Sequence, residues 1–562
     1  MTQQRPRRAF FRSARWRVTL ALTAAVLTGG SLAAATGASA APGGGGWGSE
    51  LRPGNLLVSG SYYDLNPDII VPGKTVLPPG CTSGCVKATN NGAYPQVFNN
   101  ALVDGSFGVT TPIMLDQITP SGRLVSRLQV PDGDSRSGWG SGDHAVTSFS
   151  SKSELALNLS TSGRQVTFMG YVAAPGSIDV SNSNTPGVID PTNPVPSAYY
   201  REVTQLDQQG RLRFTETNAY SGNNGRAAIL NDSDGSHGGV YYMAGNAGNG
   251  NTPQPDGVIL GAGAQIATPQ SAPEQAQRPG APTPVGSFNI TQLGDSPDKI
   301  GKDTNFRGLA VYHNVVYLTK GSGGNGVNTV YFIDTTGHAC PDGVGLPQPG
   351  AALPTSPIAY NPSLLQSEGV TPYNMCILRG FPTALKSATS FPFGIWFANP
   401  RTLYVADEGN GDNTYSTTTG TYTGAAGQTT AGLQKWVFNG QEWNLAYTLT
   451  AGLNLGVPYA VAGYPTGDNS ATGLPWAPAT DGLRNITGQV NRNGTVTVYA
   501  ITSTVSGGGD QGADPNQLVA ITDNPAAATP SAAESFRIVS PARDRVVLRG
   551  VSFTPGTGGY SR

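Results

Sequence analysis

The chain is poor in charged residues, histidine and cysteine. Only 12% of its 562 residues are charged, and it has four histidines and four cysteines. The 34 basic and 35 acidic residues leave a formal net charge of −1. This balance provides no overall field to attract nucleic acid or anionic lipid, so any electrostatic function must be local.

Several motifs are also missing, and each absence excludes a class of protein. The chain has no G-x-S-x-G nucleophile elbow, H-E-x-x-H helix, Walker loop or dinucleotide fingerprint. This removes the commonest hydrolases, metalloproteases and nucleotide-binding enzymes. No apolar run reaches the roughly 18 residues that a membrane-spanning helix requires.

The beginning of the chain has the pattern of an export signal. An arginine-rich segment precedes the apolar run 18–27, and Ala38-Ser39-Ala40 forms an A-x-A cleavage site. Within the basic segment, Arg7-Arg8 resembles a twin-arginine motif of bacterial export. The protein is therefore predicted to be secreted, and we expect three parts: a signal peptide at 1–40, a Gly-rich linker at 41–53 and a single domain at 54–562.

The four cysteines fit an exported protein, because export favours disulfides over free thiols. Cys81 and Cys85 flank a turn and are predicted to pair with each other, which leaves Cys340 and Cys376 to close a longer loop. A zinc site would need C-x-x-C spacing or nearby histidines, and only His338 is close. We therefore interpret the cysteines as structural.

Glycine and proline are abundant, with 76 and 43 residues, which argues against a helical protein. Runs rich in Val, Ile, Tyr and Phe are separated by turn signals such as STSG, DQQG and FNGQ. The runs fall into units of four, the clearest being GLAVYHN, VVYLTKG, NTVYFID and MCILRGF after Arg307. Four short antiparallel strands per unit are typical of propeller blades.

The two ends of the domain complete one such unit. LRGVSFTP, near the C-terminus, has the pattern of a first strand with no second strand after it. NLLVSGSYY, IMLDQITPSG and LVSRLQVP have the pattern of second, third and fourth strands with no first. In this blade pattern the chain resembles the six-bladed β-propeller superfamily, and more loosely secreted propeller-like proteins of bacteria and fungi that have no assigned activity. We expect an all-β propeller of about six blades, with the first blade closed by strands from both termini.

A basic residue recurs just ahead of the first apolar run in most of these units. At one register of a repeated unit, such residues should cluster in space at one mouth of the central channel. Phe393 takes the equivalent place in the remaining unit. The predicted ligand-binding cations are Lys152, Arg226, Arg307, Arg484 and Arg549.

These cations need negative charge nearby, because neighbours would repel by about 2 kcal/mol per pair. One interpretation is that a ligand carboxylate, sulfate or phosphate supplies this charge, and arginine suits planar oxyanions. The other is that the protein's own carboxylates do so and the arginines pin the blades. Candidate partners are Glu154, Asp303, Asp481 and Asp544.

The long loops are predicted to gather on one face, and function is expected there. One loop holds Glu408, Asn410 and Asp412, which alternate like part of a calcium loop. These are our metal-ligand candidates for Ca²⁺, although the first position is Glu rather than Asp and no distal Glu follows.

His144 is the one histidine predicted on the elaborated face. It lies near Trp139, a side chain suited to stacking on a sugar. Beside arginines that neutralise a uronate carboxylate, such a histidine could act as general base. A surface histidine with no catalytic role is the alternative.

We therefore predict a secreted, monomeric propeller that binds an anionic polysaccharide or another small anionic ligand, with no nucleic-acid partner. If it is an enzyme, we expect a polysaccharide lyase or glycosidase. One alternative is a non-enzymatic extracellular binding or scaffold protein. Another is a metal-dependent lactonase or esterase, as some six-bladed propellers are.

Overall fold

The largest sheet joins strands from the two ends of the chain. It has nine strands in the order β10-β9-β8-β6-β4-β1-β29, with β5 paired to β4 and β7 paired to β8. The C-terminal β29 pairs antiparallel with β1, from Leu56↔Phe553 to Tyr62↔Val546, so the predicted closure by both termini is confirmed. The strands are β1 (Leu56–Tyr62), β4 (Thr110–Ile118), β5 (Leu124–Gln129), β6 (Val146–Ser148), β7 (Asn158–Leu159), β8 (Gln165–Tyr171), β9 (Arg201–Asp207), β10 (Leu212–Thr217) and β29 (Val546–Phe553).

The remaining large sheets follow one another along the chain, each beginning with a new hairpin. A three-stranded sheet contains β11 (Gly225–Asn231), β12 (Val240–Gly245) and β13 (Ala264–Ala267). A five-stranded sheet contains β14 (Phe306–Tyr312), β15 (Val315–Lys320), β16 (Thr329–Ile333), β18 (Met375–Leu378) and β17 (Val344–Gly345). Two four-stranded sheets contain β19 (Pro392–Asn399), β20 (Thr402–Asp407), β23 (Gly432–Phe438) and β24 (Trp443–Leu449), then β25 (Ala479–Val490), β26 (Val496–Val505), β27 (Leu518–Asp523) and β28 (Arg537–Ser540).

The strands become more polar from the inside of each sheet to the outside. β11, β15 and β20 are buried along their whole length, as expected for strands covered on both faces. The outer strand β5 has only partly buried and exposed positions, and half of β28 is exposed. In several hairpins the two strands are connected by a tight turn with a glycine at positive φ, such as Gly163 or Gly494. The hydrophobic core therefore lies between neighbouring sheets.

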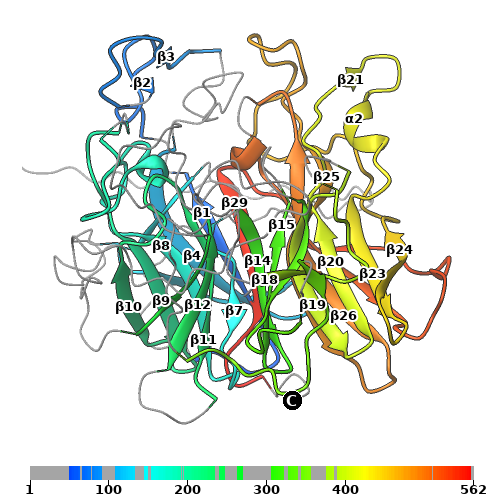
Figure 1. Ribbon diagram of the computed structural model, residues 1–562. Helices are drawn as coiled ribbons and strands as arrows, with labels where there is room; N and C mark the ends of the chain where they lie inside the picture. The colour runs from blue at the N-terminus through cyan, green and yellow to red at the C-terminus, as the bar shows by residue number, and fades with distance from the viewer. Residues whose placement is uncertain are drawn as a thin grey trace, which may run out of the picture. The chain divides into compact units, whose positions relative to one another are not determined.

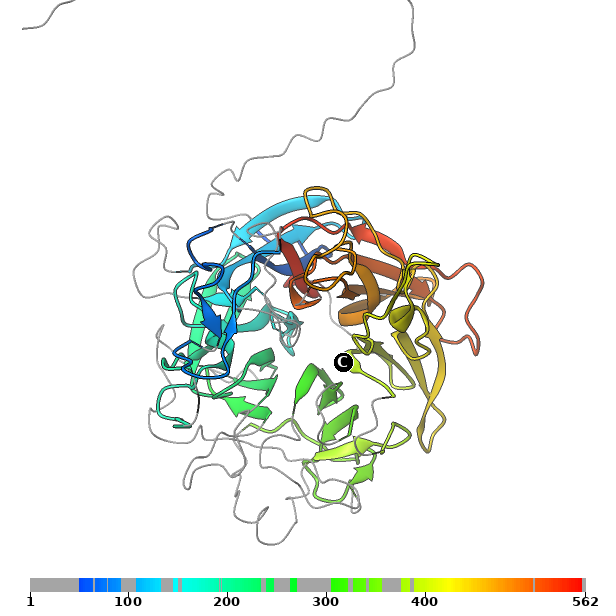
Figure 2. The same ribbon diagram turned by 90° about the horizontal axis from the view of Figure 1, so that it is seen from above.

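The innermost strands contact one another in cyclic order. β7 lies against β11, β11 against β14, β14 against β19, β19 against β25, β25 against β29, and β29 returns to β7. Figure 2 shows the sheets arranged around the central axis that these strands surround. The all-β propeller fold is therefore confirmed, while the number of six blades stays a prediction.

Glycine allows the backbones of neighbouring inner strands to come close together. A Cβ added to Gly308 on β14 would lie 2.0 Å from the carbonyl oxygen of Phe393 on β19. One added to Gly550 on β29 would lie 2.2 Å from the carbonyl oxygen of Leu155, just before β7. Any larger residue at these positions would force the two inner strands apart.

The two ends of the ring differ in their loops. The hairpins β2 (Val76–Leu77)–β3 (Val86–Lys87) and β21 (Tyr415–Ser416)–β22 (Thr421–Tyr422) lie at one end, as does helix α2 (Thr423–Ala426) (Figure 1). We call this the loop end. At the opposite end, which we call the turn end, tight turns such as that at 313–314 follow the inner strands.

This computed structural model describes residues 50–557, except 64–65, 78, 92–107, 133–144, 150–153, 192, 194, 234–238, 247–262, 270–304, 322–326, 340–342, 356–374, 385–388 and 509–510. The described residues belong to one compact unit, Gly46–Arg562. The predicted signal peptide, 1–40, lies outside them. Within the described parts, no helix is both long and apolar enough to cross a membrane.

One predicted disulfide is confirmed, between Cys81 and Cys85, whose Cα atoms are 5.7 Å apart. Cys376, on β18, is also disulfide-bonded. Its predicted partner, Cys340, lies outside the described residues, so that pairing stays a prediction.

Candidate functional site

Four of the five predicted cations are described, and all four lie on inner strands. Arg226 is the second residue of β11, Arg307 the second of β14, and Arg484 and Arg549 lie within β25 and β29. Each is buried, with an exposed fraction between 2% and 5%. Lys152 lies outside the described residues. At the start of β7, the carbonyl of Leu155 takes part in the close inter-strand approach described above.

Glu408 lies between two of the arginines. Its Oε1 is 3.9 Å from Nη2 of Arg307, and its Oε2 is 3.3 Å from Nε of Arg484. Glu408 directly follows β20 and is itself 6% exposed. This carboxylate, expected to be a metal ligand, thus forms buried ion pairs with two cations.

Arg226 and Arg549 donate mainly to carbonyl and hydroxyl oxygens. Arg226 donates from Nη1 to the carbonyl of Phe306 at 2.8 Å and to the side-chain oxygen of Asn305. Arg549 donates from Nε to the Ser61 hydroxyl at 3.1 Å and from Nη2 to the carbonyl of Phe149. Each of these bonds ties an inner strand to a neighbouring segment.

Three of the arginines lie close enough for the charge of one to lower the pKa of the next. Burial lowers the pKa of Arg226 well below its ordinary value, and the charge of Arg307 lowers it further. Burial likewise lowers the pKa of Arg307, Glu408 opposes this shift, and Arg484 adds to it. We call Arg226, Arg307 and Arg484 the arginine cluster. Phe393, predicted in the same ring, has its aromatic ring 5.7 Å from the guanidinium carbon of Arg307.

The carboxylates proposed as partners have different surroundings. Asp481 accepts hydrogen bonds from the Gly411 amide at 2.9 Å and from Gln428, and burial raises its pKa to about 7. Only part of Asp481 is therefore ionised at neutral pH, which limits how far it neutralises the charge of Arg484.

The other proposed carboxylates lie further from the ion-paired arginines. Glu154 accepts from the Thr147 hydroxyl at 2.8 Å and from the Ser148 amide at 3.1 Å. Its charge nevertheless opposes the effect of burial on the pKa of Arg226. Asp544 contacts Arg545, with Nε 3.5 Å from Oδ2. Asp303 lies outside the described residues.

The predicted calcium loop uses its oxygens in local hydrogen bonds. Oδ1 of Asn410 accepts from the Asp412 amide, and Oδ1 of Asp412 accepts from the amide and hydroxyl of Thr414. Among the residues that the structure describes, no three His, Cys, Asp or Glu side chains are grouped to hold a metal ion. A Ca²⁺ site at Glu408, Asn410 and Asp412 stays a prediction.

His144 and Trp139, predicted as general base and sugar-stacking residue, lie outside the described residues. Two other histidines are described. His313 is an exposed residue in the β14–β15 turn, and His338 follows β16.

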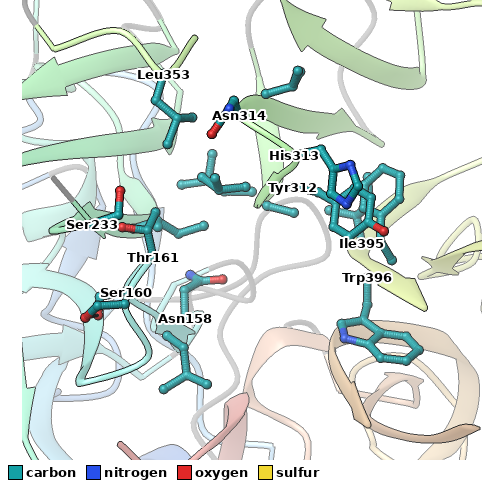
Figure 3. A pocket seen from close by; sticks show the side chains of 18 of the residues that line it. Asn158, Ser160, Thr161, Ser233, Tyr312, His313, Asn314, Leu353, Ile395 and Trp396 are labelled. Carbon is teal, nitrogen blue, oxygen red and sulfur yellow. Dashed lines mark hydrogen bonds between the residues drawn. The ribbon is translucent and has the colours of Figure 1, made fainter. Parts of the chain in front are cut away.

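A cavity of about 1440 Å³ lies at the turn end. The distal halves of the inner strands line it, including Leu157–Leu159 of the β7 segment, Ile229 of β11, Leu309–Tyr312 of β14 and Ile395–Phe397 of β19. Figure 3 shows Asn158, Thr161 and Ser233 on one side of it and Tyr312, His313 and Trp396 on the other. The cavity is thus at the opposite ends of the strands from the arginines.

Sequence reasoning missed this cavity because it assigned function to the elaborated face. The signal that could have found it is the sequence YHN at 312–314, a two-residue hairpin turn built without glycine. It also missed the pairing of Glu408, whose position directly after a second strand places it beside the start of the neighbouring inner strands.

No family model and no curated protein sequence matches the chain. Among solved structures, an acylaminoacyl peptidase in complex with Z-Gly-Gly-Phe-chloromethyl ketone is similar over 77% of this chain, with 6% identity and a TM-score of 0.27. The match covers 41% of the peptidase, so the chain spans about two fifths of its length. A polysaccharide lyase, ulvan lyase of family PL25 bound to -[GlcA(1-4)Rha3S]-, is similar over 90% of this chain and 97% of the lyase, with 10% identity and a TM-score of 0.28. Scores this low assign no function to the chain.

Proposed function

We propose that this chain is an extracellular six-bladed propeller that binds an acidic glycan at its loop end. The observation that carries the proposal is the arginine cluster, in which three cations influence one another and two of them share one carboxylate, Glu408. Asp481 adds only part of a negative charge at neutral pH, because burial raises its pKa to about 7. The cyclic contacts of the inner strands support the blade number.

The cluster acts on a ligand mainly through its field. The three arginines are at most 5% exposed, so they are poorly placed to bind a carboxylate from bulk water directly. A concentration of positive charge in a poorly polarisable surrounding nevertheless attracts anions to the adjoining surface. A uronate or sulfated sugar at the loop end would therefore gain affinity from the cluster, and this gain would weaken with salt.

Binding to a panel of acidic and neutral polysaccharides tests the proposal, with titration calorimetry at low and high salt. Glu408→Gln raises the net positive charge, so we expect acidic glycans to bind about tenfold more tightly. Arg226→Gln should weaken binding by a similar factor. Arg211→Gln is the matched control, because Arg211 is an exposed arginine paired with Asp207 on a different hairpin.

The same panel separates enzyme from scaffold. New unsaturated uronate ends would support a lyase, and new reducing ends without unsaturation a glycosidase. Binding without new ends would support a non-enzymatic binding protein. If no acidic glycan binds, or if Glu408→Gln and Arg226→Gln change affinity in the same direction, the arginine cluster serves only to pin the sheets.

A further inference from the structure

The cavity at the turn end has one polar wall that is already organised. Asp232 accepts hydrogen bonds from the Ser162 amide at 2.8 Å and from the Ser162 hydroxyl at 2.6 Å. It also accepts from the hydroxyls of Ser160 and Thr161, at 3.1 and 3.2 Å. These bonds fix the turn after β7 against the end of β11. The wall can therefore meet a ligand without first becoming ordered.

The facing wall is a stack of rings. Tyr312 lies parallel to Phe397, with ring centroids 4.5 Å apart and an interplanar angle of 2°. His313 stacks on Tyr312 at 4.3 Å and 19°, and its side chain is exposed. The imidazole thus has one face covered by Tyr312 and offers the other outward. A stacked ring of this kind suits the C–H face of a sugar.

The turn that holds His313 has an uncommon backbone. His313 and Asn314 both have positive φ, 46° and 61°, the combination found in a type I′ hairpin. Asn and His enter this region more readily than other non-glycine residues, but glycine adopts it with the least strain. A non-glycine residue kept there at the mouth of a cavity points to a use for its ring.

Two buried donors on the cavity wall have no acceptor in the described part of the chain. They are Nδ2 of Asn158 and Nε1 of Trp396. Trp396 is 8% exposed, and its indole ring lies across the cavity from Asn158 (Figure 3). A buried donor without an acceptor destabilises the protein, and a ligand oxygen that accepted from it would recover part of that loss.

The charges of this cavity also differ from those of the loop end. Its lining holds one arginine, Arg164, and one carboxylate, Asp232, beside hydroxyl, amide and aliphatic groups. Arg164 donates to the Ser162 hydroxyl and the Asp232 carbonyl. Among the lining residues that the structure describes, charge of neither sign is concentrated, and a neutral ligand fits this lining better than an anion.

We propose that the turn-end cavity is a second binding site, which takes the end of a neutral saccharide. The sugar's hydroxyl oxygens would accept from Asn158 and Trp396, while its C–H face would lie against His313. This site is separate from the arginine cluster and does not depend on the acidic-glycan proposal, so either can fail alone.

Neutral oligosaccharides test the site directly. Hexasaccharides of β-1,4-glucose, β-1,4-xylose, β-1,4-mannose and α-1,4-glucose would be titrated against the secreted protein and followed by saturation-transfer NMR. We expect at least one to bind, and His313→Gly to weaken it about tenfold, because the ring contact is lost while glycine accepts the backbone. Asn158→Leu should weaken it several-fold through loss of the amide donor.

The control is Asn314→Gly, which changes the same turn and keeps the imidazole. We expect its affinity to stay within about twofold of the parent, with unchanged thermal unfolding. Equal weakening by His313→Gly and Asn314→Gly, or binding by none of the hexasaccharides, would overturn the proposal. A third result would also overturn it: every cavity variant keeps its affinity for the saccharide but loses binding of the apolar dye ANS. The cavity would then be a site for apolar molecules.

Discussion

The two ends of the ring use the same inner strands for different purposes. Toward the loop end, four of these strands carry arginines that are 2–5% exposed and bonded to protein acceptors. At the turn end, the same strands line a cavity of about 1440 Å³ whose mouth includes the exposed His313. The loop end thus concentrates positive charge on buried side chains, whereas the turn end combines a cavity with little charge among its described lining residues.

One end of the ring of sheets thus has mainly a structural role, and the other has a cavity suited to binding. The loop end needs close approach between strands, which the glycines beside the basic register allow. Buried arginines can then bridge neighbouring strands, as Arg226 does to Asn305 and Phe306 at the start of β14. At the turn end the inner strands line a cavity, where side chains can meet a ligand.

Removing the carboxylate of Glu408 should have the largest effect on the loop end. In Glu408→Gln, the positive charges of Arg307 and Arg484 remain buried without their shared carboxylate. Leaving a buried charge without its partner destabilises by about 3–5 kcal/mol, so we expect a loss near 4 kcal/mol in denaturant unfolding. Glu442→Gln, at an exposed carboxylate on the β23–β24 turn, is the control and should change stability little.

A small effect of Glu408→Gln would mean that water or another group already screens the cluster. The loop end would then be open to solvent like the turn end, and the contrast between them would disappear.

A second change tests the close packing of inner strands near the arginines. In Gly308→Ala, the new methyl group would overlap the Phe393 carbonyl at 2.0 Å, and backbone cannot rotate away as a side chain can. We expect a loss of about 3 kcal/mol, at the upper end of overpacking effects. Gly60→Ala is the matched control in β1, where the nearest atoms would be 3.4 Å away. Similar losses for both would contradict a special role of the inner junction.

Much of the fold could be predicted from the sequence because it depends on local patterns. The β29–β1 closure follows from an unpaired first-strand pattern at one end and a missing one at the other. The hairpin at β14–β15 follows from GLAVYHN and VVYLTKG. Alternation, apolar runs and turn residues carry this information within a few residues of each other.

The site could be predicted only in part, because it depends on contacts between distant residues. The register of Arg226, Arg307, Arg484 and Arg549 was visible as a repeat, and all four lie on inner strands. The choice of Glu408 as their carboxylate was not visible, since it belongs to a loop whose spacing resembled a calcium motif. Asp481, expected to be a partner, is held by Gly411 and Gln428. Such assignments require the path of the loop in three dimensions.

The stability of the loop end should depend on pH through Asp481. Burial raises the pKa of Asp481 to about 7 in the folded protein, above its ordinary value of 3.8. Between these values the folded chain holds a proton that the unfolded chain has released, so stability falls as pH rises toward 7. The contribution is about 1.4 kcal/mol per pH unit and levels off above pH 7.

Asp481→Asn removes the titrating group, so this contribution to the pH dependence of stability disappears. The difference in unfolding free energy between parent and variant should therefore shift by about 2 kcal/mol from pH 5 to pH 7, in favour of the variant. Denaturant titrations at the two pH values measure it. A constant difference would indicate that Asp481 ionises normally and helps to neutralise Arg484, which would make the loop end less positive than we infer.

The smallest expected effect lies at the turn end, in the stability of His313→Gly. Glycine relieves the positive φ of 46° but loses the stacking on Tyr312 and adds freedom to the unfolded chain. These contributions oppose one another at about 1 kcal/mol each, so we expect a net change below about 1 kcal/mol. A loss as large as that of Glu408→Gln would show that the His313–Tyr312–Phe397 stack supports the ring as firmly as the arginines do. Both ends of the ring would then stabilise the fold. The saccharide site would have to be tested with Asn158→Leu, because weaker binding by His313→Gly could result from the loss of stability.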